Sequence, residues 1–143
     1  MAFLIVTSVF VSCTASPLQG QTSSPTPQET VGTSPFREVV QTFDGDFTLT
    51  LDITPNRSGP NVFTLSVRDN HTMKPVTDVV VTLYTTMQDM VMGTDSVTLH
   101  ATGKGLFSAT SNNLAMRGHW AIGITIATPD HIIHKAGVSV ITL

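Results

Sequence analysis

The sequence has few charged residues and almost no cysteine. Only 12% of its 143 residues are charged, and the formal net charge is −3. A nucleic-acid-binding domain normally carries a basic stripe, so this composition argues against that class. Cys13 is the only cysteine, which excludes an intrachain disulfide. A domain in an oxidising compartment would therefore depend on its hydrophobic core for stability.

Motifs of enzyme chemistry are also lacking. No Ser/His/Asp arrangement stands at an identifiable nucleophile turn, and the few acidic residues lie in turns or on exposed strand positions. The Gly-Lys-Gly segment 103–105 precedes an expected strand rather than a helix, so it is not a phosphate-binding loop. The Asp-Gly-Asp segment 44–46 offers one acid pair, whereas calcium takes about 6–8 oxygen ligands, and we interpret it as a turn. We therefore expect that the protein is not an enzyme.

Helical periodicity is missing over any useful length, and alternation with period two takes its place. Val, Ile and Thr are prominent, which favours strands. Apolar residues alternate with polar ones in the runs 47–53, 63–67, 79–83, 97–99, 120–126 and 138–140. Such alternation indicates strands with one buried face. About seven strands over residues 44–143 predict an all-β, immunoglobulin-like β-sandwich with Trp120 as a buried anchor.

The N-terminal part divides into two segments outside this domain. Residues 1–16 are apolar and uncharged, but the basic region of a secretory signal is missing. Two interpretations stay open: a lipoprotein-like signal with Cys13 after a small residue, or the remnant of a transmembrane helix, which needs about 20 apolar residues to span a bilayer. Both place the rest of the chain outside the cytoplasm. Residues 17–43, rich in Ser, Thr, Pro and Gln at their start, are expected to be an extended linker.

Methionine is concentrated in one short segment, and this is the strongest candidate for a site. Three of the six methionines lie within residues 87–92, and a fourth precedes a His-Trp pair. Thioethers are soft ligands that favour Cu(I), but they also fill gaps at the ends of apolar cores. Because loops cluster at the two ends of a sandwich, these side chains can meet in one metal site or form one apolar plug. The candidate metal ligands are Met87, Met90, Met92, Met116 and His119.

Histidines elsewhere offer weaker candidates. His131 and His134 are three residues apart, so in a strand they face opposite sides and make a poor ligand pair. His71 lies with Met73 in a hairpin-like loop and gives a second, weaker metal candidate. We expect each of these three histidines at the surface.

Three segments carry a resemblance to a known family: the turn 54–63 (TPNRSGPNVF), the strand start 105–109 (GLFSA) and the turn 114–120 (LAMRGHW). Over residues 44–143 the chain resembles the YtkA-like or FixH-like extracytoplasmic domain found at the C-terminus of CopD-type copper transport proteins. That family has a "Pro-Gly-x-x-Gly-Pro-Asn" turn, a "Gly-x-Tyr" strand and a "Leu-Pro-Gly-x-Trp" turn. Here Phe107 replaces the tyrosine and Met116 lies near the usual proline. These motifs are turns and core anchors, so they bear on the fold more than on the chemistry.

The resemblance implies a place in copper handling at the cell membrane, with the folded domain on the extracytoplasmic side. Residues 2–12 look like the end of the last membrane helix before this domain in CopD proteins. On that interpretation, which stays open beside the lipoprotein-like signal, the chain is a split or truncated form of a larger membrane protein. Copper is the implied cofactor, and a copper transporter or an oxidase-assembly factor is the implied partner. The alternative is a non-metal interaction module that docks on a membrane partner, including a FixH-like role in oxidase assembly.

Overall fold

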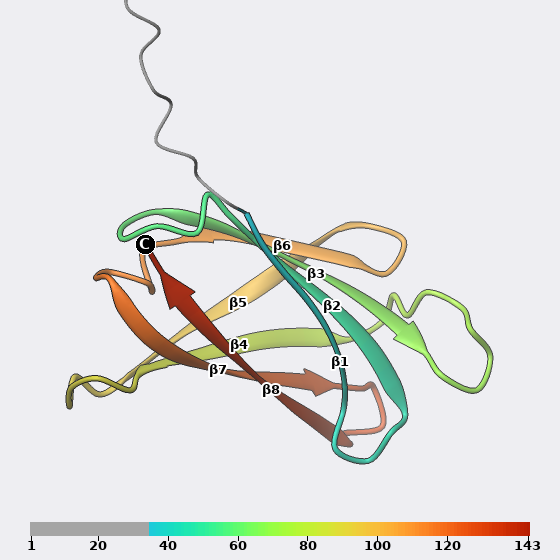
Figure 1. Ribbon diagram of the computed structural model, residues 1–143. Coiled ribbons are helices and arrows are strands. Elements are labelled where there is room, and N and C mark those ends of the chain that lie inside the picture. Colours follow the sequence, from blue (N-terminus) through green and yellow to red (C-terminus); the bar gives the residue numbers. More distant parts are fainter. Residues whose placement is uncertain (1–34) are drawn as a thin grey trace, which may run out of the picture.

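The computed structural model describes residues 35–143, and these residues form eight antiparallel strands and no helix (Figure 1). The all-β prediction is confirmed. The strands are β1 (Phe36–Gln41), β2 (Phe47–Thr54), β3 (Asn61–Asp69), β4 (Val80–Met87), β5 (Thr94–Gly103), β6 (Leu106–Ser111), β7 (Gly118–Ala127) and β8 (Ile133–Thr142). Since the described part contains no helix, it offers none that could cross a membrane.

All eight strands belong to one hydrogen-bonded sheet with the order β1-β2-β3-β6-β5-β4-β7-β8. The sheet curls into two layers, with β5 running diagonally between them (Figure 1). Residues 94–99 of β5 pair with β4, whereas residues 100–103 pair with β6, across a register shift between Ala101 and Gly103. A strand that changes layers through a bulge is one way to turn a corner. The layers are therefore not two separate sheets, as they would be in an immunoglobulin domain.

The core follows the alternation that the sequence displays. Alternate residues of β2, β3, β4, β7 and β8 are buried, while their neighbours are half-buried or exposed. Trp120 is buried as expected. The side chains that are almost fully buried include Leu49, Leu51, Ile53, Phe63, Leu65, Leu83, Phe107, Leu114, Ile122, Ile124 and Ile126. Because burial of such side chains is the main driving force for folding, this continuous core can stabilise the domain without a disulfide.

The folded part starts earlier than expected, and this corrects the 17–43 boundary of the linker. Residues 36–41 form β1 and pair in register with β2. Phe36 and Val40 pack against the core, but Arg37, Glu38 and Gln41 between and beside them weaken the apolar signal. This strand raises the number from about seven to eight. The apolar segment 1–16, with Cys13, and linker residues 17–34 lie outside the described residues.

The fold has two distinct ends, which we name by their side chains. At the methionine end, Met87 of β4 pairs with Trp120 of β7, and Gly59 in the β2–β3 turn donates its N–H to Leu114 O. At the Asp/His end, Phe43 in the β1–β2 turn donates its N–H to Lys135 O of β8 over 2.8 Å. Nine residue steps of β7 separate the ends, which corresponds to roughly 30 Å of strand.

Candidate functional site

The methionine end is built around Met87, the last residue of β4. Its side chain is buried in the core. A Cβ atom added to Gly118 would lie 2.7 Å from Met87 Cε, so the thioether fills the space that the glycine leaves free. Met116 is also packed against the core, and its carbonyl accepts the indole N–H of Trp120 at 3.1 Å. These two methionines therefore have the gap-filling role that flexible thioethers often take.

Met90 and Met92 are placed differently. Both lie in the connection 88–93 between β4 and β5, and each is 51% exposed. Val91 between them is fully exposed. The hairpin tip therefore presents two accessible thioethers beside an apolar side chain. Folded proteins usually bury side chains of these kinds.

Asp89 fastens this hairpin to the start of β7. Its Oδ2 accepts the backbone N–H of His119 at 2.7 Å, and His119 Nδ1 lies 3.0 Å from Asp89 Oδ1. In the opposite direction, Gln88 donates its N–H to His119 O. The imidazole is held by Nδ1, which leaves Nε2 as the nitrogen available to a ligand. A carboxylate that orients a histidine in this way is common behind metal-binding histidines.

All five predicted metal ligands thus belong to one end of the fold, but they fall into two groups. Met87 and Met116 pack against the core, whereas Met90, Met92 and His119 are accessible to solvent. Sequence reasoning missed Asp89, although its position between Met87 and Met90 in a hairpin was a usable signal.

Asp89 gives the first prediction, on the pH dependence of stability. The backbone N–H of His119, followed by its imidazole, holds the pKa of Asp89 below its ordinary value. A carboxyl group with a lowered pKa stabilises the fold above its unfolded pKa of about 3.9 and loses that contribution as the pH falls through the folded value. Wild type should therefore have a higher urea midpoint than Asp89→Asn at neutral pH. The difference should vanish in acid; a difference that persists unchanged there would contradict the assignment.

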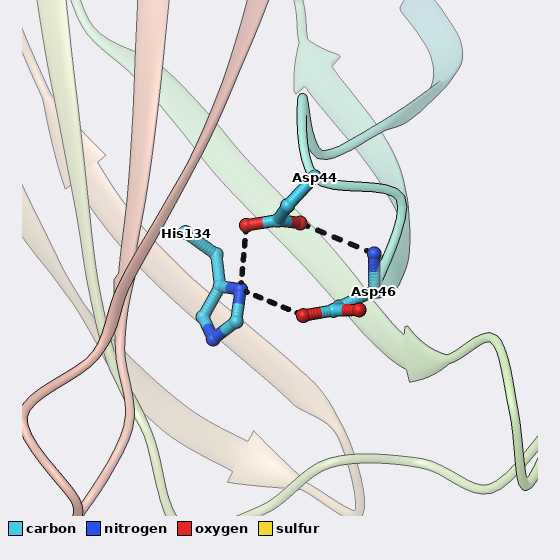
Figure 2. Close-up of side chains that lie close together, drawn as sticks. All are labelled: Asp44, Asp46 and His134. Carbon is cyan, nitrogen blue, oxygen red and sulfur yellow. Dashed lines mark hydrogen bonds and ion pairs between the residues drawn. The ribbon is translucent and has the colours of Figure 1, made fainter.

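A second cluster, at the Asp/His end, joins Asp44 and Asp46 to His134 (Figure 2). His134 Nδ1 lies 2.8 Å from Asp44 Oδ2 and 3.6 Å from Asp46 Oδ2. Its side chain is only 7% exposed, so the expectation of a surface histidine is wrong for His134. The signal was its parity: His134 continues the buried series Ala136, Val138 and Val140.

Hydrogen bonds fix the carboxylate of Asp44. Its Oδ1 accepts the Thr42 hydroxyl at 2.6 Å and the Asp46 backbone N–H at 3.1 Å. The Thr42 hydroxyl is the main reason why the pKa of Asp44 lies below its usual value, ahead of the Asp46 N–H and His134. The segment 44–46 is a turn, as interpreted from the sequence. As the connection between β1 and β2, it also supplies the two carboxylates of this cluster.

The other histidines remain at the surface. His131 is exposed in the β7–β8 turn, so His131 and His134 do not form a ligand pair. His71 is exposed in the β3–β4 loop, and its Nε2 lies 3.4 Å from Asp46 Oδ1. Met73 in the same loop is exposed, with a backbone φ of 59°. His71 thus contacts the Asp/His cluster at its edge, through the carboxylate of Asp46.

Comparison with known proteins gives one match. Neither a curated protein nor a solved structure matches the chain. The YtkA-like family model matches residues 40–125, which is more than half of the chain. The match runs from β1 into β7, so it includes the hairpin with Met90 and Met92 but ends before β8 and His134. On this evidence the chain belongs to the YtkA-like family.

Proposed function

We propose that this YtkA-like domain is a membrane-tethered, extracytoplasmic module of copper transport or resistance that binds Cu(I) at the methionine end. The observation that carries the proposal is the pair of half-exposed thioethers in the hairpin whose Asp89 orients His119. Soft thioether ligands favour Cu(I) over harder ions. The role is binding and transfer, and no catalytic step is assigned.

The candidate ligands of this site have two different roles. Met90, Met92 and His119 Nε2 are the accessible donors, so they receive the ion first. Met87 is in the core and Met116 packs against it, so both support this end of the fold, although a shift of a flexible thioether can expose its sulfur to the ion. Such a site is open on one side, which suits an ion that is passed on to a partner.

The tether is the second part of the proposal. The apolar segment 1–16 has a composition that fits a lipoprotein-like signal or part of a membrane helix. β1 enters the fold at the methionine end, because Phe36 pairs with Ile53 near the β2–β3 turn. We therefore place the copper site on the side where the linker joins the domain, near a CopD-type transporter.

Titration of Cu(I) under anaerobic conditions, in competition with a chelator, tests the site. Even outer-shell partners are worth about 10- to 100-fold in metal affinity, so Met90→Leu/Met92→Leu should weaken Cu(I) binding by at least about tenfold. Leucine keeps the size and apolar character of the side chain but lacks the sulfur. Met73→Leu is the matched control, since Met73 is 62% exposed at the other end. Equal affinities of wild type and the double variant would overturn the proposal.

One observation favours an alternative of a different class. Met90, Val91 and Met92 form an exposed apolar tip, and such tips are typical of surfaces that dock on other proteins. The domain would then be a non-metal interaction module on a membrane partner, including a FixH-like factor of oxidase assembly. Copper retained after purification from copper-fed cells favours the first function. A metal-free protein with a stable partner in a membrane pull-down favours the second.

A further inference from the structure

The Asp/His cluster lies outside the proposed copper site and combines three side chains that can ligate metal ions. Asp44 and Asp46 come from the β1–β2 turn, and His134 comes from β8, which approaches that turn from the other edge of the sheet. One ligand atom from each residue lies within 4.8 Å of the other two. Figure 2 shows His134 Nδ1 facing both carboxylates, while the second ring nitrogen points away.

The distances suit a small ion with short bonds. Two ligand atoms about 2.1 Å from a tetrahedral ion are about 3.4 Å apart. His134 Nδ1 lies 2.8 Å from one carboxylate oxygen and 3.6 Å from the other. Both of these separations are within 1 Å of the required one, and the third, between the two carboxylates, is at most 4.8 Å, so side-chain rotations can admit the ion.

The ligands are also held in place from behind. The His134 ring packs edge-on against Phe47 with 4.5 Å between the ring centroids. Thr42 and the Asp46 N–H hold Asp44 by Oδ1, which leaves Oδ2 directed at the imidazole. Such outer-shell contacts orient ligands in metal sites. They distinguish this cluster from carboxylates that meet by chance on a surface.

The ligand set decides the class of ion. An imidazole with two carboxylates suits borderline divalent ions such as Zn²⁺. Calcium would need about 6–8 oxygen ligands, and Mg²⁺ prefers oxygen as well. The carboxylates are 40% and 45% exposed, so an ion can enter and water can complete its coordination. His71, at the border of the cluster through Asp46 Oδ1, is a further available donor.

We propose that Asp44, Asp46 and His134 bind a borderline divalent metal ion of the Zn²⁺ class, independently of the methionine end. On binding, the ion takes the place of the proton that His134 Nδ1 shares with Asp44, and that proton moves to Nε2 or to solvent. The ion then links the β1–β2 turn to β8. It adds to the hydrogen bond from Phe43 N–H to Lys135 O at this place and should stabilise the domain by mass action.

Calorimetric titration of Zn²⁺ into the full chain, purified in detergent without a histidine tag and freed of metal, tests this site. Wild type should bind one Zn²⁺ with micromolar or tighter affinity. Asp46→Asn and His134→Gln should each weaken binding by roughly 10- to 100-fold or more. Removal of the buried His134 ring can unfold the chain, whereas Asp46 is half-exposed, so Asp46→Asn keeps the test decisive. Mg²⁺ and Ca²⁺ should produce no comparable heat.

Controls separate this site from the copper site. His131→Gln, three residues before His134, and the double variant Met90→Leu/Met92→Leu should both bind Zn²⁺ as wild type does. Conversely, Asp46→Asn should leave Cu(I) affinity unchanged. Wild type that fails to bind Zn²⁺ at micromolar concentrations would show that the cluster is an ion pair only, and would overturn the proposal. Undiminished Zn²⁺ binding by a folded Asp46→Asn variant would overturn it as well.

Discussion

Replacement of Gly105 by alanine is expected to lower the free energy of unfolding by roughly 2–6 kcal/mol, from left-handed strain and overpacking together. Gly105 has a φ of +70° and stands just before β6. A Cβ atom there would lie 2.7 Å from Pro75 Cβ and 2.9 Å from Val67 O. Neither group is the end of a flexible side chain, so residue 105 would have to move away from the backbone of β3 and from Pro75 in the β3–β4 loop. Urea denaturation measures the loss.

Gly45 provides the matched control for this prediction. It has a similar φ of +82°, but no atom lies within 4 Å of an added Cβ. Gly45→Ala should therefore cost only the left-handed backbone penalty of about 1–2 kcal/mol. Equal losses for the two variants would contradict the crowding around Gly105.

Phe107→Ala is expected to destabilise the domain by about 3–5 kcal/mol, because it removes a buried ring and leaves a cavity. Phe107 lies on β6 opposite Leu65 of β3 and is among the largest fully buried side chains. For a domain whose whole stability is on the order of 5–15 kcal/mol, this loss is large. Thermal and urea unfolding of wild type and variant measure it.

Phe43→Ala distinguishes burial from the mere loss of a phenylalanine. Phe43 is 79% exposed in the β1–β2 turn, so its truncation should change stability by less than about 1 kcal/mol. A small loss of stability for Phe107→Ala, or a large loss for Phe43→Ala, would contradict the core described for this domain.

Gly105 and Phe107 belong to the motif that carried the family resemblance. Their expected effects are on stability, which fits a motif that specifies the fold.

Much of the fold follows from alternation alone, and its exceptions have physical reasons. β2, β3, β4, β7 and β8 were predicted because one face of each is buried throughout. β1 was hidden because Glu38 interrupts the half-buried series of Phe36 and Val40, while Val39 is on the exposed face. The change of layer within β5 was not predictable either. Its partners β4 and β6 are its neighbours in the chain and in the sheet, but the alternation does not show at which residue β5 passes from one partner to the other.

The methionine end and the Asp/His cluster differ in how much of each could be predicted from the sequence. The methionine cluster was visible because its members are close in the sequence, and the structure added the division into buried and exposed thioethers. Asp44 and His134 are 90 residues apart, and they meet only because the curled sheet brings the β1–β2 turn to β8. Each residue was noticed separately as a turn or a surface group. Their meeting depends on sheet closure, which a local pattern does not encode.

The central proposal, Cu(I) at the exposed thioethers of the methionine end, is tested most directly by NMR of ¹³C-methyl-labelled methionines during an anaerobic Cu(I) titration. The methyl resonances of Met90 and Met92 should shift until one equivalent is added, because their sulfur atoms become ligands. The resonance of Met73, which is even more accessible at the far end, should stay in place. Resonances of Met90 and Met92 that do not move, or that move no more than that of Met73, would contradict the proposal.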